Sequence, residues 1–123
     1  MEGGGVSLVL TDNGRNRIRD AINTDFSSGQ TGTGTFPPEI SQTALFFPIA
    51  ATLNALSTKI VSAETITVTH VVTTGEGNSS YFSEWEILGN SDATDYNRIV
   101  RPGLLKTSNT QITMIQSFNI ERI

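Results

Sequence analysis

Hydrophobic and polar residues alternate over the last part of the chain, residues 111–120. Ile112, Met114 and Phe118 stand at alternate positions, and only the polar Gln116 interrupts this apolar series. Successive side chains of a β-strand point to opposite faces of the sheet. The pattern therefore predicts a half-buried strand at a central position in a sheet.

Residues 98–105 form a second strand-like run, and the polar turn 106–110 joins it to the last strand. Two strands joined by a short turn predict an antiparallel hairpin. An isolated hairpin is only marginally stable in water, so the rest of the chain must supply strands or a helix that cover it.

The strongest strand pattern lies in the middle of the chain, over residues 59–74. Its predicted apolar face carries Ile66, Val68, His70 and Val72. Residues 75–78 read as a turn, and residues 81–88 predict the next strand. The two faces of this next strand carry Tyr81, Ser83, Trp85 and Ile87 on one side and Phe82, Glu84, Glu86 and Leu88 on the other. A polar loop over residues 89–96 leads from it to the hairpin.

One helix is predicted near the N-terminus, over residues 12–23. Thr11 can accept a hydrogen bond from a free backbone N–H of the first turn, as an N-cap residue does. An apolar stripe at helical spacing consists of Ile18, Ala21, Ile22 and Phe26. The polar side carries Arg15, Arg17 and Arg19. We interpret these arginines as a solvated face, the alternative being a patch that binds an anion or a partner.

The segment between the helix and the strongest strand carries turn and loop signals. Residues 27–35 read SSGQTGTGT and predict a flexible connection. A phosphate-binding loop would need a lysine and a hydroxyl residue after its last glycine, and Gly34 is not followed by them. Prolines make residues 36–39 rigid and extended. We expect a bent segment to bury both Phe46 and Phe47, the alternative being that one of them meets a neighbouring chain.

One helix and about six strands predict a mainly β fold. We expect a small antiparallel β-sandwich with one N-terminal α-helix packed on it. The 123 residues fit a single domain, 1–123, with a glycine-rich flexible arm over residues 1–5. Charged residues make up only 16% of the chain, so the polar surface must consist largely of Thr, Ser, Asn and Gly.

The composition disfavours several classes of function. A net charge of −4 is a poor basis for general nucleic-acid binding. The chain has no cysteine, no apolar run of membrane-spanning length and no signal-peptide pattern at its N-terminus, so we expect it to be made in a cytosol.

Residues suited to catalysis are also few. His70 is the only histidine, and we interpret it as a half-buried residue at a sheet edge or interface. Glu84 and Glu86 share a strand face as a glycosidase pair could, but same-face neighbours are more often surface carboxylates that pair with an arginine. We therefore expect no enzymatic activity, no cofactor and no metal.

Three segments together resemble a known family. These are LTDNGRNRIRDAI at residues 10–22, GQTGTGTFPPEISQTAL at residues 29–45, and SEWEIL at residues 83–88 followed by NRIVRPGLLKTSNTQITMIQSFNI. In this order they are similar to the small structural domain of tail-fibre and related minor virion proteins of tailed bacterial and archaeal viruses. Glu86 departs from the family pattern, which tends to carry glycine there.

The resemblance implies a virion structural protein, assembled in the host cytoplasm, whose partners are copies of itself and other virion proteins. Family members often continue into a fibre shaft, whereas this sequence ends at Ile123. We therefore expect a stand-alone tail or baseplate component or a fibre adaptor, with a capsid decoration protein as the alternative. Residue types enriched at interfaces suggest the contact residues Phe46, Phe47, Tyr81, Trp85, Arg15, Arg17 and Arg19.

A second alternative is a carbohydrate-binding module that recognises a host-surface glycan. Tyr81 and Trp85 on one strand face could stack on a sugar, with Asn78 and Glu84 nearby to donate or accept hydrogen bonds. This alternative requires that face of the strand to be open to solvent.

Overall fold

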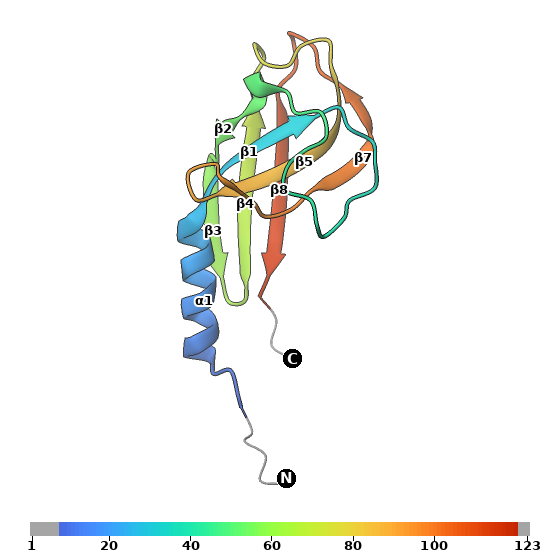
Figure 1. Ribbon diagram of the computed structural model, residues 1–123. Coiled ribbons are helices and arrows are strands. Elements are labelled where there is room, and N and C mark those ends of the chain that lie inside the picture. The colour runs from blue at the N-terminus through green and yellow to red at the C-terminus, as the bar shows by residue number, and fades with distance from the viewer. Residues whose placement is uncertain (1–7, 121–123) are drawn as a thin grey trace.

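The computed structural model describes residues 8–120, and the predicted arm over residues 1–5 lies outside this range. Two antiparallel sheets pack face to face, and one N-terminal helix lies beside them (Figure 1). The predicted mainly β sandwich with one helix is therefore confirmed. Among the described residues, no helix is long and apolar enough to cross a membrane.

The first sheet has the strand order β2-β1-β5-β6, and β7 also pairs with β5. Its strands are β1 (Phe26–Gly32), β2 (Asn54–Ala55), β5 (Tyr81–Gly89), β6 (Thr94–Asp95) and β7 (Ile99–Leu105). The second sheet has the order β3-β4-β8. Its strands are β3 (Thr58–Ser62), β4 (Thr65–Val72) and β8 (Ile112–Asn119). A short 3₁₀ helix, η1 (Ala50–Thr52), leads into β2.

The core lies between the two sheets and has two centres. One consists of Phe26, Ile66, Val68 and Ile87, with Ile22 and Phe118 against it. The other consists of Val72, Phe82 and Trp85, with Ile112 and Met114 against it. Burial alternates along β4 as predicted, so the apolar face assigned to it is confirmed.

The predicted closing hairpin is wrong. β7 pairs with β5 in the first sheet, whereas β8 pairs with β4 in the second. The turn between them therefore crosses from one sheet to the other. β8 is an edge strand of its sheet and not a central one, although its predicted alternation of buried and exposed residues is confirmed.

The run predicted as one strand over residues 59–74 is in fact the hairpin of β3 and β4. The chain turns at Ala63, whose φ of 47° is left-handed, and the Thr65 hydroxyl donates to Ser62 O across the turn (2.8 Å). The hydrophobic alternation does not reveal this turn, because the residues on both sides of it continue the same strand composition.

The glycine-rich run at residues 27–35 is also not the flexible connection that its composition predicts. Most of it forms β1, which pairs with β5 in the first sheet. A Cβ atom on Gly29 would lie 2.6 Å from the His70 ring, so glycine here permits a close approach of the two sheets. His70 itself is 1% exposed on the central strand β4, not half-buried at an edge.

The helix α1 (Asp12–Asp25) begins where it was predicted and ends two residues later. The Thr11 side chain accepts from Gly14 N (3.1 Å), which confirms the N-cap. At the other end, Lys59 Nζ donates to the carbonyls of Asn23 and Phe26 (2.9 Å each). This ammonium lies where the helix dipole favours a positive charge.

The arginines of α1 do not form one solvated face as interpreted from the sequence. Arg19 Nη1 donates to Ala63 O (2.5 Å), and Arg15 Nη1 lies 3.8 Å from a Glu64 carboxylate oxygen. Both contacts bind the helix to the β3–β4 turn, while Arg17 is exposed. The helix has no buried residue, and Ile18 from its predicted apolar stripe remains 45% exposed.

Candidate functional site

A long loop, residues 33–49, covers the face of β5 that points away from the second sheet. Trp85 and Ile87 of β5 point into the core, so the alternate residues Glu84 and Glu86 point toward this loop. The base of the loop is closed by backbone hydrogen bonds from Thr33 N to Phe47 O and from Ile49 N to Thr31 O (3.0 Å each). Between these bonds the loop has no helix or strand, so it depends on side chains for its shape.

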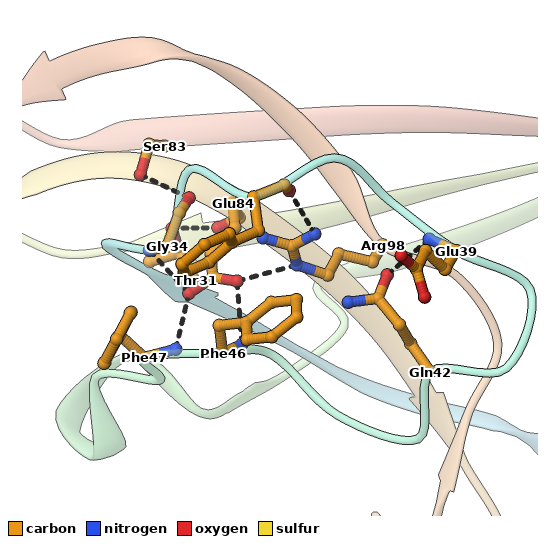
Figure 2. Close-up of polar contacts among 10 residues, drawn as sticks. Thr31, Gly34, Glu39, Gln42, Phe46, Phe47, Ser83, Glu84 and Arg98 are labelled. Atoms are coloured by element: carbon orange, nitrogen blue, oxygen red, sulfur yellow. Dashed lines mark hydrogen bonds and ion pairs between the residues drawn. The ribbon is translucent and has the colours of Figure 1, made fainter.

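Glu84 provides most of that support (Figure 2). Its carboxylate is fully buried and accepts hydrogen bonds from the backbone N–H groups of Gly34 (2.7 Å), Phe46 (3.0 Å) and Phe47 (2.8 Å). Burial alone would raise the pKa of Glu84. Hydrogen bonds from Arg98 and from the three backbone groups outweigh burial, so the pKa lies below its usual value.

Arg98 is the cationic partner of Glu84. Its Nε donates to Glu84 Oε1 (2.8 Å), and its Nη1 donates to Phe36 O (2.6 Å) in the same loop. The guanidinium also lies over the Phe46 ring, 4.6 Å from the ring centroid. Because Arg98 precedes β7, this ion pair joins the loop, β5 and the beginning of β7 into one unit.

Gly34, in the same glycine-rich run, also lies where a side chain would collide with a neighbouring residue. A Cβ atom at this position would lie 2.6 Å from Glu84 Oε2, so only glycine fits between the loop and the carboxylate. The Gly34 N–H that could have faced a phosphate already donates to Glu84. This geometry agrees with the absence of a phosphate-binding sequence pattern.

Glu86, two residues further along β5, has the opposite character. It is 3% exposed, and its Oε1 has no hydrogen-bond partner among the described residues. Burial, followed by the neighbouring negative charge of Asp95, raises the pKa of Glu86 to about 8. Burial also raises the pKa of Asp95. At neutral pH the two carboxyl groups therefore hold a proton between them.

Replacing Glu86 by glutamine is expected to stabilise the protein at alkaline pH. Unfolding exposes Glu86, whose pKa then falls from about 8 toward 4.5. The wild-type free energy of unfolding should thus decline by up to about 1.4 kcal/mol per pH unit between these values, and Glu86→Gln should remove that decline. Urea unfolding between about pH 5 and pH 8 measures the effect. Glu39→Gln is the matched control, since Glu39 is exposed; an unchanged pH slope in Glu86→Gln would contradict the assignment.

A hollow of about 360 Å³ lies between the loop and the segment that leads into β7. Its walls include Glu39, Gln42 and Asp95. Gln42 Oε1 accepts from Glu39 N (2.7 Å), a contact that shapes this wall (Figure 2). Among the described residues, no group of three or more acidic or histidine side chains could hold a metal ion.

The loop exposes aromatic rings on its outer side. Phe36, Phe46 and Phe47 are 54%, 46% and 56% exposed, and the Phe36 and Phe46 rings lie 4.9 Å apart. Our expectation that Phe46 and Phe47 are both buried is therefore wrong. Their consecutive N–H groups both point at Glu84, which leaves the two side chains on the solvent side of the loop.

The other predicted contact residues do not gather around this loop. Tyr81 is 59% exposed and lies opposite Leu105 of β7. Trp85 is only 1% exposed, because β5 lies inside the first sheet with the core on this face. Trp85 therefore cannot contact a partner or stack on a sugar, which removes the predicted Tyr81–Trp85 sugar platform.

Sequence reasoning missed the roles of Arg98 and Lys106. The interpretation of Glu84 and Glu86 as surface carboxylates is wrong, because both are buried, at 0% and 3% exposure. The option that one of them pairs with an arginine holds for Glu84, whose partner Arg98 the sequence did not identify. Both missed residues are buried, at 7% and 0% exposure. A buried cation needs specific partners. The decisive partners here, Glu84 for Arg98 and Asn78 for Lys106, lie 14 and 28 residues away, so the local sequence carries no signal for these roles.

Comparison with known proteins adds no family to this description. No family model matches the chain, and no curated protein shows significant similarity to it.

Proposed function

We propose that this chain is a non-enzymatic structural protein of a tailed-virus particle, a tail or baseplate component or fibre adaptor that acts through multimeric packing. The observation that carries the proposal is the anchored loop over residues 33–49. A buried charge pair fixes its backbone while three phenylalanine rings face solvent. Exposed aromatic side chains on a fixed backbone lose little entropy on binding, so they suit contact with another protein.

The resemblance to virion proteins supports the same conclusion. Gly34 and Glu84 stand at motif positions of this resemblance, and the Gly34 N–H donates to Glu84 beneath the loop. Two of the similar positions thus help to fix the contact surface. The partners in this proposal are other virion proteins and copies of the chain, and repetition on a particle makes weak contacts strong.

Particle composition tests the proposal. We expect the protein in purified particles, with threefold or sixfold rings at the tail for a baseplate component or adaptor. Hundreds of copies on the shell would replace this role with capsid decoration. Absence of the protein from purified particles would refute the proposal.

A loop variant tests whether the exposed rings make the contact. Phe47→Ser should leave the fold intact but lower incorporation into particles about tenfold, the effect of losing about 1.4 kcal/mol at a contact centre. Quantitative mass spectrometry of particles measures this ratio. Ile60→Ser is the matched control, since Ile60 is 58% exposed on β3, away from the loop. Equal incorporation of Phe47→Ser and wild type would show that the loop is not the contact.

A further inference from the structure

The edges of the two sheets differ in how they are protected against pairing with another strand. β2 and β6 have only two residues each, and β7 carries Pro102 at an irregularity in its pairing with β5. β3 lies beside α1 (Figure 1) and carries Lys59. Short strands, proline, lysine and covering helices are the usual devices that prevent edge pairing.

β8 has none of these devices. Its sequence, ITMIQSFN, is eight residues long and contains no charged residue, proline or glycine. Its pairing with β4 is continuous from Ile112 to Asn119 without a bulge. In the described part of the chain, β4 is its one strand neighbour. β8 is therefore a regular, uncharged edge that can accept another strand.

The side chains of β8 are also incompletely covered. On its inner face Ile112, Met114 and Phe118 are half-buried, whereas Val68 on the neighbouring β4 is fully buried. On its outer face Ile115 is 62% exposed. A strand added along this edge would cover Ile112, Met114 and Phe118 on the inner face and Ile115 on the outer face.

We infer that β8 pairs antiparallel with β8 of a second copy of this chain, which joins two three-stranded sheets into one of six strands. A second copy fits because β8 is complementary to itself: it carries no charge, and in an antiparallel pair its apolar residues can lie opposite apolar residues of the same strand, as Ile112 can opposite Phe118. An antiparallel pair of identical strands forms around a two-fold axis, so one surface serves both partners.

Side-chain parity restricts the register. Residues directly opposite each other must lie on the same face of the sheet, so outer residues meet outer residues. Centring the pair on Ile115 places it opposite its own copy and places Ile112 opposite Phe118. Centring the pair on Gln116 would instead bring two amide side chains together at the inner face. Of the two, only the first register sets Ile115, which is 62% exposed in the single chain, against an apolar side chain, and we assign it to the pair.

This inference specifies one contact within the proposed assembly role, but its test does not require a virus particle. The dimer is measured on the isolated protein, whereas the virion role is tested by particle composition. Each can therefore fail without the other.

The oligomeric state of Ile115→Lys tests the pairing. The wild type should be a dimer by analytical ultracentrifugation. Ile115→Lys should weaken dimerisation by at least about 100-fold, because two ammonium groups would meet at the axis. Ile60→Lys is the matched control on the opposite edge of the same sheet and should remain dimeric. Circular dichroism confirms that each variant is folded. A monomeric wild type at millimolar concentration, or a dimeric Ile115→Lys, would overturn the inference.

A cross-link provides a second measurement that does not depend on a destabilising charge. The chain has no cysteine, so Ile115→Cys introduces one thiol per copy. Oxidation should convert Ile115→Cys into a covalent dimer within the dimer concentration range, because directly opposite residues of paired strands lie within disulfide distance. Ile60→Cys should remain uncross-linked under the same conditions. Equal cross-linking of both variants would indicate random collision and would overturn the register.

Discussion

Replacing Glu84 by glutamine is expected to lower the free energy of unfolding by about 3–5 kcal/mol at neutral pH, the usual cost of breaking a buried ion pair on one side. Each carboxylate oxygen of Glu84 accepts two hydrogen bonds, so neither oxygen can become an NH₂ group without facing two donors. The substitution also leaves Arg98 buried without its partner. A typical domain has only about 5–15 kcal/mol of stability, so this loss is a large fraction of the total.

The pH dependence gives this prediction a second readout. The pKa of Glu84 is lower in the folded state than its usual value, so the group contributes stability that is present above the unfolded-state pKa. That stability is lost as the pH falls through the folded-state pKa. Urea unfolding between about pH 3 and pH 7 should therefore show a shallower acid loss in Glu84→Gln than in the wild type.

Two further variants separate the charge pair from the backbone contacts. Arg98→Met should also destabilise, and the double variant should lose less than the sum of the two single losses, because no unpaired charge remains. Glu86→Gln is the control for a glutamate on the same face of β5, and it should have the opposite sign at alkaline pH. Additive losses, or a loss in Glu84→Gln below about 1 kcal/mol, would contradict the anchoring role of the pair.

The elements that sequence reasoning placed correctly have a local signal. The N-cap Thr11 marks the beginning of α1, and strict alternation marks β4 and β8. These patterns record whether a residue faces the core, and that information lies within a few neighbouring positions. Fold class follows from counting such elements, which is why it could be predicted.

What could not be predicted depends on distant partners. β7 and β8 are adjacent in sequence, yet each pairs with a different sheet, and alternation does not say which strand a neighbour will be. β1 reads as a loop because its glycines were interpreted by their flexibility. Their actual role depends on His70 and Glu84, which are 41 and 50 residues away from Gly29 and Gly34.

The candidate site shows the same division. The residue types Phe46 and Phe47 suggested a contact surface, and both rings are exposed in the structure. Their exposure was predicted wrongly, because it results from backbone N–H groups turned toward a carboxylate more than 35 residues away. A buried acceptor in one strand therefore determines which side of a distant loop meets the solvent.

Replacing Lys106 by methionine should lower the free energy of unfolding by about 3 kcal/mol. The substitution removes charge-assisted hydrogen bonds and leaves their acceptors without a donor. Lys106 is fully buried, and its Nζ donates to Asn78 Oδ1 and Thr107 O (2.8 Å each) and to Thr74 O (3.2 Å). Methionine preserves most of the apolar stem, so the change isolates the ammonium group.

The position of Lys106 explains why the loss should be large. It lies at the point where the chain leaves β7 and turns toward β8, and backbone hydrogen bonds join it to Ser79 and Ser80. Its side chain thus binds the turn after β4 to the turn after β7, so two of the chain's crossings between the sheets share one buried group. In Lys106→Met, the backbone amides of residues 79 and 106 should exchange their hydrogens faster than in the wild type, while those of β4 should change less.

Lys59→Met is the matched control for this effect. Lys59 Nζ also donates to two backbone carbonyls, but its side chain is largely exposed and water can replace it. Lys59→Met should lower the free energy of unfolding by only about 0.5 kcal/mol, the usual contribution of a cation at a helix C-terminus. Urea unfolding of both variants at the same pH gives the comparison. Equal losses in the two variants would mean that burial of the Lys106 ammonium adds nothing, and that another feature directs the chain from one sheet to the other.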